Sequence, residues 1–302
     1  MTRWITKSAF SGIIAGAVCL GCSSGGGSTA TSDTVVATVD VASVDTAAVE
    51  VGTPVTDAVV VDSGLPSAEV TPDTGPDTAA PASCKAKPPP CVDAMILDLS
   101  LHADKKSTGA VTTTKEGDDF VTVIDATAGG FNQSSKNPWV YVAFTSEGAK
   151  RVELDDESAL ESMDWDLSLR RFILRLNGGD SGPSCVGAVS FLEKTYADLT
   201  SVPAGLKYKL DDYYTDSCSI VNDSSGLPGS PQVALAPWWS YPGCVSTTQV
   251  PHLVRLGDGR VIKLLVEQYY KDAAHQKACD TTQAAPAGAV AAVFTLRWRF
   301  MP

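Results

Sequence analysis

The residues with the most explicit chemistry in this chain of 302 are its eight cysteines. Cys19 and Cys22 lie near the N-terminus, which leaves an even number in the rest of the chain. These are Cys84, Cys91, Cys185, Cys218, Cys244 and Cys279. An even set of cysteines in an exported domain predicts three disulfides, and their connectivity cannot be read from spacing alone. Cys84 and Cys91 flank the short, stiff stretch KAKPPP, so we expect these two to form one pair.

A zinc site is the alternative interpretation of the same six cysteines. Zinc sites usually show paired cysteines at Cys-x-x-Cys spacing, with further Cys or His residues at regular intervals. None of the six lies at that spacing from another, and no histidine lies near one of them at ligand spacing. The sequence therefore favours disulfides, and with them an oxidising compartment, and we expect no metal.

Segment 179–183, GDSGP, resembles the nucleophile segment of chymotrypsin-like proteases. Acyl transfer by serine needs a base within hydrogen-bond reach and an acid that orients the base, and in that fold the order is His, Asp, Ser. The order along this chain is Asp166, Ser181, His275. Segment 179–183 is better explained as a turn, and we expect that the protein is not an enzyme.

Two further stretches carry groups that contact ligands in other proteins. Trp238, Trp239 and Tyr241 lie between two prolines, where large rings can stack on a ligand or pack beneath a long loop. The sequence leaves both alternatives open. The acidic stretch 211–216, DDYYTD, offers oxygen atoms for calcium but matches no calcium-loop spacing, so we expect a solvated turn there.

The elements that must position these residues show period-two alternation of apolar side chains and no long helical period. Strand 139–144 (WVYVAF) and the return strand 150–154 predict a hairpin, as do 254–256 and 261–266 around Gly-Asp-Gly. In the closing strand 294–300, apolar and polar residues alternate without interruption. The sequence predicts a single all-β, mainly antiparallel domain.

Segment 165–182 (WDLSLRRFILRLNGGDSG) carries one irregularity in this alternation. The apolar phase slips by one residue at Arg170 and Arg171, which predicts a bulge there. The Asn-Gly-Gly at 177–179 then predicts the end of the strand, since these residues tolerate positive φ. The acid-rich segment 155–163 is the one short helix that we expect.

The N-terminal segment 1–22 has the pattern of a secretory signal peptide. Arg3 and Lys7 precede an apolar run that is too short for a permanent membrane span. Its end, VCLGCS, resembles a bacterial lipoprotein signal, with Gly before Cys22 as the lipidation site, although Cys19 stands where such signals usually carry Leu. The alternative is ordinary cleavage that leaves Cys22 as a free thiol. A lipid on Cys22 predicts attachment to a membrane.

Residues 23–83 predict a disordered linker ahead of a folded domain at 84–302. From 23 to 83 the chain has no aromatic residue, no histidine and no basic residue, and is composed mainly of Ala, Thr, Val, Ser and Asp with Gly and Pro. Such a segment cannot build a core. Its acids supply most of the formal net charge of −12. The domain has no basic run with interleaved aromatics, so we expect no nucleic-acid partner.

Three parts of the domain together resemble the HmuY-like bacterial lipoproteins. The first is the aromatic-rich hairpin at 139–154. The second is the central pattern in 165–182 of Trp-Asp, a basic strand, Asn-Gly-Gly and Ser-Gly. The third combines Gly-Asp-Gly at 257–259, Tyr269 and Tyr270 with the closing strand. The resemblance covers about 139–300, and the lipoprotein signal agrees with the usual location of this family.

This resemblance implies an outer-membrane lipoprotein, facing the periplasm or the cell surface, that captures haem and passes it to an outer-membrane transporter. In that family, side chains on loops bind the haem iron. His252 follows a proline at the start of a hairpin strand and His275 lies in a polar loop, so these two are the candidate haem ligands, and the alternative is that each is an ordinary structural or surface histidine. The alternative is a structural or adhesive surface lipoprotein without a cofactor.

Overall fold

The computed structural model describes residues 84–127, 136–225, 227 and 229–302. Within these ranges, no helix is long and apolar enough to cross a membrane. Three predictions lie outside the described residues: the signal peptide 1–22, lipidation of Cys22 and the linker 23–83.

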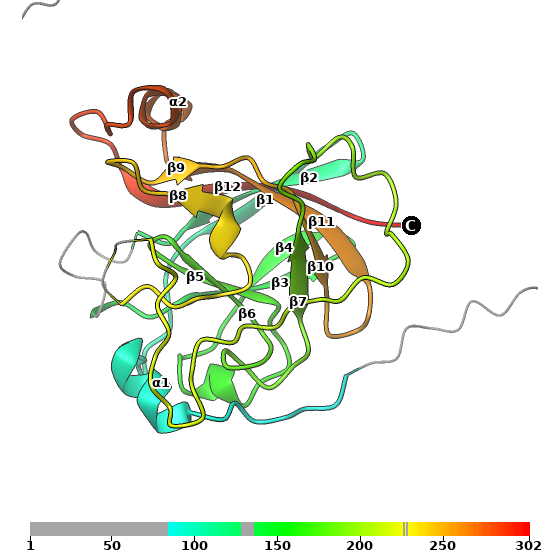
Figure 1. The fold of residues 1–302 in the computed structure, drawn as a ribbon, viewed down its shortest axis with the longest axis vertical. Coiled ribbons are helices and arrows are strands. Elements are labelled where there is room, and N and C mark those ends of the chain that lie inside the picture. The colour runs from blue at the N-terminus through cyan, green and yellow to red at the C-terminus, as the bar shows by residue number, and fades with distance from the viewer. Residues whose placement is uncertain (1–83, 128–135, 226, 228) are drawn as a thin grey trace, which may run out of the picture. The chain divides into compact units, whose positions relative to one another are not determined.

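The larger sheet has six antiparallel strands in the order β1-β2-β12-β11-β10-β7 (Figure 1). The chain therefore forms a mainly antiparallel β domain, as the alternation predicted. The central strands β11 and β12 are the longest, and β7 lies at one end of the order. The strands are β1 Val111–Glu116, β2 Asp119–Asp125, β7 Gly187–Ser190, β10 His252–Arg255, β11 Val261–Tyr270 and β12 Ala291–Phe300.

A second sheet has four antiparallel strands in the order β4-β3-β5-β6, and a third pairs β8 with β9. Their bounds are β3 Val140–Thr145, β4 Gly148–Val152, β5 Leu167–Arg170, β6 Ile173–Leu176, β8 Trp239–Ser240 and β9 Ser246–Thr247. Four short helices complete the described elements. They are α1 Val92–Asp98, η2 Ser158–Leu160, η3 Ala236–Trp238 and α2 Ala273–Thr282. Of these, the sequence predicted only the segment that contains η2.

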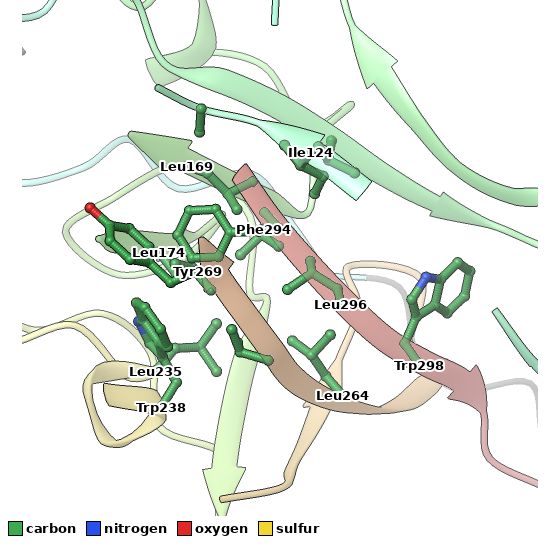
Figure 2. Close-up of a cluster of buried hydrophobic side chains, with 14 of the residues drawn as sticks. Ile124, Leu169, Leu174, Leu235, Trp238, Leu264, Tyr269, Phe294, Leu296 and Trp298 are labelled. Atoms are coloured by element: carbon green, nitrogen blue, oxygen red, sulfur yellow. The ribbon is translucent and has the colours of Figure 1, made fainter. Parts of the chain in front are cut away.

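The main hydrophobic core combines side chains from both larger sheets (Figure 2). Phe294, Leu296 and Trp298 of β12 are fully buried, as the alternation of the closing strand predicted. Trp298 stacks on Phe120 of β2 with ring centroids 4.6 Å apart. Burial of each such side chain contributes about 1.5–3 kcal/mol, so this strand is a main source of stability.

A second core lies around α1, where Met95 and Leu99 pack near Trp139. The guanidinium groups of Arg170 and Arg175 each lie 4.7 Å from a ring centroid of Trp139. Arg170 also donates to the carbonyl of Leu99 at the end of α1. These two arginines hold α1 against the second sheet by cation–π contacts and hydrogen bonds.

The bulge predicted at Arg170 and Arg171 is wrong. β5 and β6 form a hairpin in which Leu169 pairs with Leu174 and Arg170 with Ile173. Two residues connect the strands, and Arg171 takes the left-handed conformation with φ of 53°. The slip in the apolar phase therefore marks a tight turn between two strands, because a turn of this length reverses the chain and resets which face each residue occupies.

Asp166, at the start of the hairpin, makes stability depend on pH. Its carboxylate accepts the backbone N–H of Phe144 at 2.8 Å, and burial raises its pKa to about 6. The unfolded value is about 3.9, so the folded state binds more protons between these two pH values and the free energy of unfolding falls as pH rises. We expect the wild type to lose about 2 kcal/mol relative to Asp166→Asn between pH 4 and pH 7.

Urea unfolding of both proteins at pH 4 and pH 7 measures this difference. Asp164→Asn, which removes an exposed carboxylate two residues away, controls for the change in net charge. If the two proteins differ in free energy of unfolding by the same amount at both pH values, the raised pKa of Asp166 is contradicted. A wild type that gains stability relative to Asp166→Asn as pH rises would also contradict it.

Candidate functional site

A groove of about 1070 Å³ lies between the start of the described chain, β7 and the loops that follow it. We call it the lysine groove because four lysines line it: Lys85, Lys87, Lys207 and Lys209. Apolar side chains lie among them, and they include Pro88, Pro90, Val189, Leu192, Leu210 and Pro237. Leu192 is 74% exposed, so part of the apolar surface is open to a ligand.

The first wall of the groove is the extended segment 84–90. The backbone N–H of Cys84 donates to the carbonyl of Gly257 at 3.1 Å, and that of Lys87 donates to the carbonyl of Pro183 at 2.8 Å. Three consecutive prolines follow, and each fixes its own φ. The wall is therefore attached at two points and has little backbone freedom beyond them.

The second wall is formed by β7 and the segment that contains Lys207 and Lys209. Ala188 and Lys209 exchange both backbone hydrogen bonds, at 2.8 and 2.9 Å. This pairing covers the outer edge of β7, which would otherwise present unpaired backbone groups. It also holds the two lysines, which are spaced two residues apart, beside the groove.

The floor of the groove depends on Gly179, in the predicted Asn-Gly-Gly turn that follows β6. Its φ is +64°, and a Cβ at this position would lie 2.0 Å from the carbonyl oxygen of Asp211. The backbone N–H of Asp180 donates to the same carbonyl at 2.8 Å. Glycine is therefore required both for the left-handed turn and for the close approach of the two chain segments.

The charges that a ligand meets in the lysine groove are mainly positive. All four lysines are exposed, and none forms an ion pair within the part of the chain that the structure describes. Two of the carboxylates in the lining are buried and face other partners. Asp180 accepts the backbone N–H groups of Tyr213 and Tyr214, at 2.6 and 2.8 Å, and Asp211 belongs to the buried network described next.

Ser181 and Asp211 form a buried network behind the groove. The hydroxyl of Ser181 donates to Asp211 Oδ2 at 2.6 Å and lies 3.0 Å from the hydroxyl of Tyr213. Arg175 Nε donates to Ser181 Oγ at 3.2 Å. Among the described contacts of Ser181 there is no histidine. The expectation of a solvated turn at 211–216 is wrong for Asp211, which is fully buried and whose pKa burial raises to about 6.

The two histidines expected as haem ligands lie apart from the lysine groove. His252 is fully buried at the start of β10, where its Nδ1 lies 2.9 Å from Ser190 Oγ of β7. Burial lowers the pKa of His252 to about 4, so this ring is neutral at pH 7. His275 lies on α2, half-buried. Neither histidine lines the lysine groove, and the buried ring of His252 is not open to a ligand at the surface.

The aromatic cluster divides between core and surface. Trp238 and Trp239 are 1% and 7% exposed. Trp238 packs against Phe294 of β12, with centroids 5.4 Å apart, and is seen within the core in Figure 2. Core packing, one of the two alternatives that the sequence left open, is therefore correct for both tryptophans. Tyr241, at 46% exposed, is the member of the cluster that a ligand can reach.

The cysteines pair differently from the expectation. Disulfides join Cys91 to Cys218 and Cys244 to Cys279. The predicted pair of Cys84 with Cys91 is wrong, because Cys91, the residue before α1, is bonded to Cys218 instead. Cys84 and Cys185 are free thiols in this structure. No group of three or more potential metal ligands is found among the described residues.

A smaller cavity of about 350 Å³ is lined by Lys105, Lys106, Asp125 and Arg170, among others. None of the histidines, cysteines or clustered aromatics predicted as site residues lines it. The lysine groove is larger than this cavity and contains a predicted site residue, Cys185, so it is the better candidate site.

Sequence reasoning missed the four lysines, although a signal for them is present. They occur as two Lys-x-Lys pairs, at 85–87 and at 207–209. Alternating lysines on extended backbone place two charges on one side. Nothing in the sequence, however, indicates that the two pairs lie across one groove, because more than a hundred residues separate them.

One family model matches part of this chain. Residues 135–282 match the family model described as HmuY protein. No curated protein matches the chain.

Solved structures of low identity are also similar. A putative HmuY-like heme binding protein from Bacteroides vulgatus is 16% identical with a TM-score of 0.39, over 62% of this chain and 95% of that one. An apo HmuY analog from Tannerella forsythia is 16% identical with a TM-score of 0.35, over 66% of this chain and 100% of that one. The family finding is therefore the match of residues 135–282, just under half of the chain, and this part of the domain is similar to the HmuY family.

Proposed function

We propose that this chain is a lipid-anchored, extracytoplasmic binding protein of the HmuY type, and that the lysine groove is its ligand site. In this proposal a lipid on Cys22 holds the domain 84–302 at the bacterial outer membrane, on the periplasmic side or the cell surface, and 23–83 is the spacer. The observation that supports this choice of site is the lining of the groove, in which four unpaired lysines surround apolar side chains.

The ligand that suits this groove is an amphipathic anion, and haem is the first to test. Haem presents a flat apolar ring with two propionate groups at one edge. The ammonium groups of the lysines can form ion pairs with the propionates, and the prolines and leucines can make apolar contacts with the ring. The volume of about 1070 Å³ is at the upper end of the usual range for small-molecule sites, so a ring of this size can enter.

The groove fits the carboxylates of haem better than it fits the iron. No histidine, methionine or tyrosine is among the residues that line it, and Cys185 is the one sulfur donor there. That thiol already contacts the thiol of Cys84. We therefore assign haem to the groove through ionic and apolar contacts and assign no side chain as an iron ligand. Release to an outer-membrane transporter then requires no iron–side-chain bond to break.

Charge reversal at Lys207 and Lys209 tests the site. We expect Lys207→Glu/Lys209→Glu to weaken haemin binding by about tenfold or more, because two attractive contacts become repulsive. Titration of the full chain with haemin, followed by the Soret band and repeated at higher salt, measures this change. The control is Lys271→Glu/Lys277→Glu, which alters net charge equally at exposed lysines outside the groove. Equal weakening in both variants would rule out the groove as the site.

Iron-free protoporphyrin IX separates the two modes of binding. If the groove holds the porphyrin through its carboxylates and ring, protoporphyrin and haemin bind with affinities within about threefold of each other, a difference of less than 1 kcal/mol. A much tighter complex with haemin, lost in His275→Ala, would instead support iron ligation by a histidine.

The second candidate function is a structural or adhesive surface lipoprotein without a cofactor. The observation that favours it is the burial of His252, which removes one expected ligand from any open surface. Absence of saturable binding of either porphyrin at micromolar concentration would favour this alternative.

A further inference from the structure

Three segments that are distant in sequence meet at the rim of the lysine groove. The backbone N–H of Cys84 donates to the carbonyl of Gly257 at 3.1 Å. The Sγ of Cys84 lies 3.3 Å from the hydroxyl oxygen of Ser184. A Cβ added to Gly257 would lie 2.6 Å from that same Ser184 oxygen, so the three segments are packed without room between them. Cys84 is therefore fixed against the segment that contains Cys185.

Cys185 directly follows Ser184 in the chain, so the 3.3 Å contact of Cys84 Sγ with Ser184 Oγ places Cys84 next to Cys185. The neighbours of Cys185 in the chain are firmly held, since Ser184 N–H donates to Asn177 Oδ1 at 3.1 Å and Val186 N–H donates to the Asn177 carbonyl at 3.0 Å. The segments of both cysteines are thus held beside each other by hydrogen bonds on either side of the pair. The other four cysteines of the domain are already joined in two disulfides.

We propose that Cys84 and Cys185 form a third disulfide, which locks the start of the domain to the wall of the lysine groove. Each thiol loses its proton, one S–S bond forms, and the two electrons pass to the disulfide of a thiol–disulfide oxidoreductase, which becomes a dithiol. Burial and the neighbouring thiol raise the pKa of Cys185 to about 11, so little Cys185 thiolate is present at pH 7 and oxidation through this thiol is slow without such a catalyst.

The disulfide determines how the domain is held on the rest of the chain. Lys85 is the first basic residue after Lys7, so a trypsin-like cut after Lys85 separates all preceding residues from the domain. The bond after Lys87 precedes a proline and resists such proteases. With Cys84 joined to Cys185, the N-terminal fragment stays covalently attached after the cut. The disulfide therefore keeps the domain on its tether even when the exposed Lys85 is cleaved.

Limited trypsin digestion of the full chain, purified after export, tests this proposal. We expect the fragment that ends at Lys85 to remain attached on a non-reducing gel and to separate when reductant is added. In Cys185→Ser the fragment separates without reductant, and we expect cleavage after Lys85 to become about tenfold faster as local opening of the wall becomes easier. Separation of the wild-type fragment without reductant would overturn the proposal.

A second measurement decides the case even if trypsin does not reach Lys85 or the variant does not fold. The wild-type chain is alkylated in denaturant, so that buried thiols react, and is then digested completely without reduction. A peptide that links Cys84 to Cys185 supports the disulfide, whereas alkylated Cys84 and Cys185 overturn it. Both measurements read a covalent bond, so their outcome is independent of whether the groove binds haem.

Discussion

Replacing Cys91 and Cys218 with serine is expected to lower the free energy of unfolding by about 5 kcal/mol. This disulfide joins residues separated by 127 positions, and closing so long a loop removes much of the conformational freedom of the unfolded chain. The pair also attaches α1, which begins after Cys91, to the loop of Cys218. Because Met95 of α1 is fully buried in the second core, the substitution should loosen that core as well.

The matched control is Cys244→Ser/Cys279→Ser, since that disulfide joins residues only 35 positions apart. The same relation gives a loss of about 4 kcal/mol for it. Both variants are best made in a background with Cys84→Ser/Cys185→Ser, so that no overlapping loop changes the comparison. Urea unfolding, followed by tryptophan fluorescence, measures the two losses. A smaller loss for the 91–218 pair than for the 244–279 pair would contradict the expected order.

The sheets of this domain were predictable because one face of most strands is buried. In β12 the apolar residues Phe294, Leu296 and Trp298 alternate with polar ones, and all three face the core. Period-two alternation has no other common cause, so the same residues predict both the strand and the face of it that is buried. The hairpins around Gly148 and Gly259 follow from the same alternation of strands, and both glycines take positive φ.

The helices were not predictable by the same reasoning. α1 has seven residues and α2 has ten, so neither is long enough to show a clear helical period. One local signal was present at α2, where the side chain of Asp272 accepts the N–H of Ala274 at 2.8 Å as an N-cap. A single Asp before two alanines is too common to carry a prediction alone.

The candidate site was the least predictable part, because it is assembled from separate segments. Lys85 and Lys209 line one groove although they are far apart in sequence. The pairing of Cys91 with Cys218 depends on the direction in which α1 leaves the first wall. His252 was a candidate haem ligand at the start of a predicted strand, but β10 lies between β7 and β11 and the ring is fully buried. Each of these facts depends on tertiary packing and has no local signature.

Asp211→Ala is the second substitution with a large expected effect, a loss of about 4 kcal/mol of unfolding free energy. The carboxylate accepts the backbone N–H groups of Leu176 and Ala234, at 2.9 and 2.8 Å, and the hydroxyl of Ser181 at 2.6 Å. Its removal leaves buried donors without partners, each at about 1–3 kcal/mol. It also removes a nearby negative charge from Arg175, which is fully buried.

The neighbouring residue provides the control, since Asp212 is exposed and also lines the lysine groove. Asp212→Ala should change stability by less than about 0.5 kcal/mol. The same substitution removes a negative charge from the groove, so it should strengthen binding of an anionic ligand by a small factor at low salt. Equal losses of stability in the two variants would show that the buried network does not hold the floor of the groove. We expect a loss of stability in Asp211→Ala alone and tighter haemin binding in Asp212→Ala. These two results would show that adjacent carboxylates have separate roles, Asp211 in the fold and Asp212 in the ligand site.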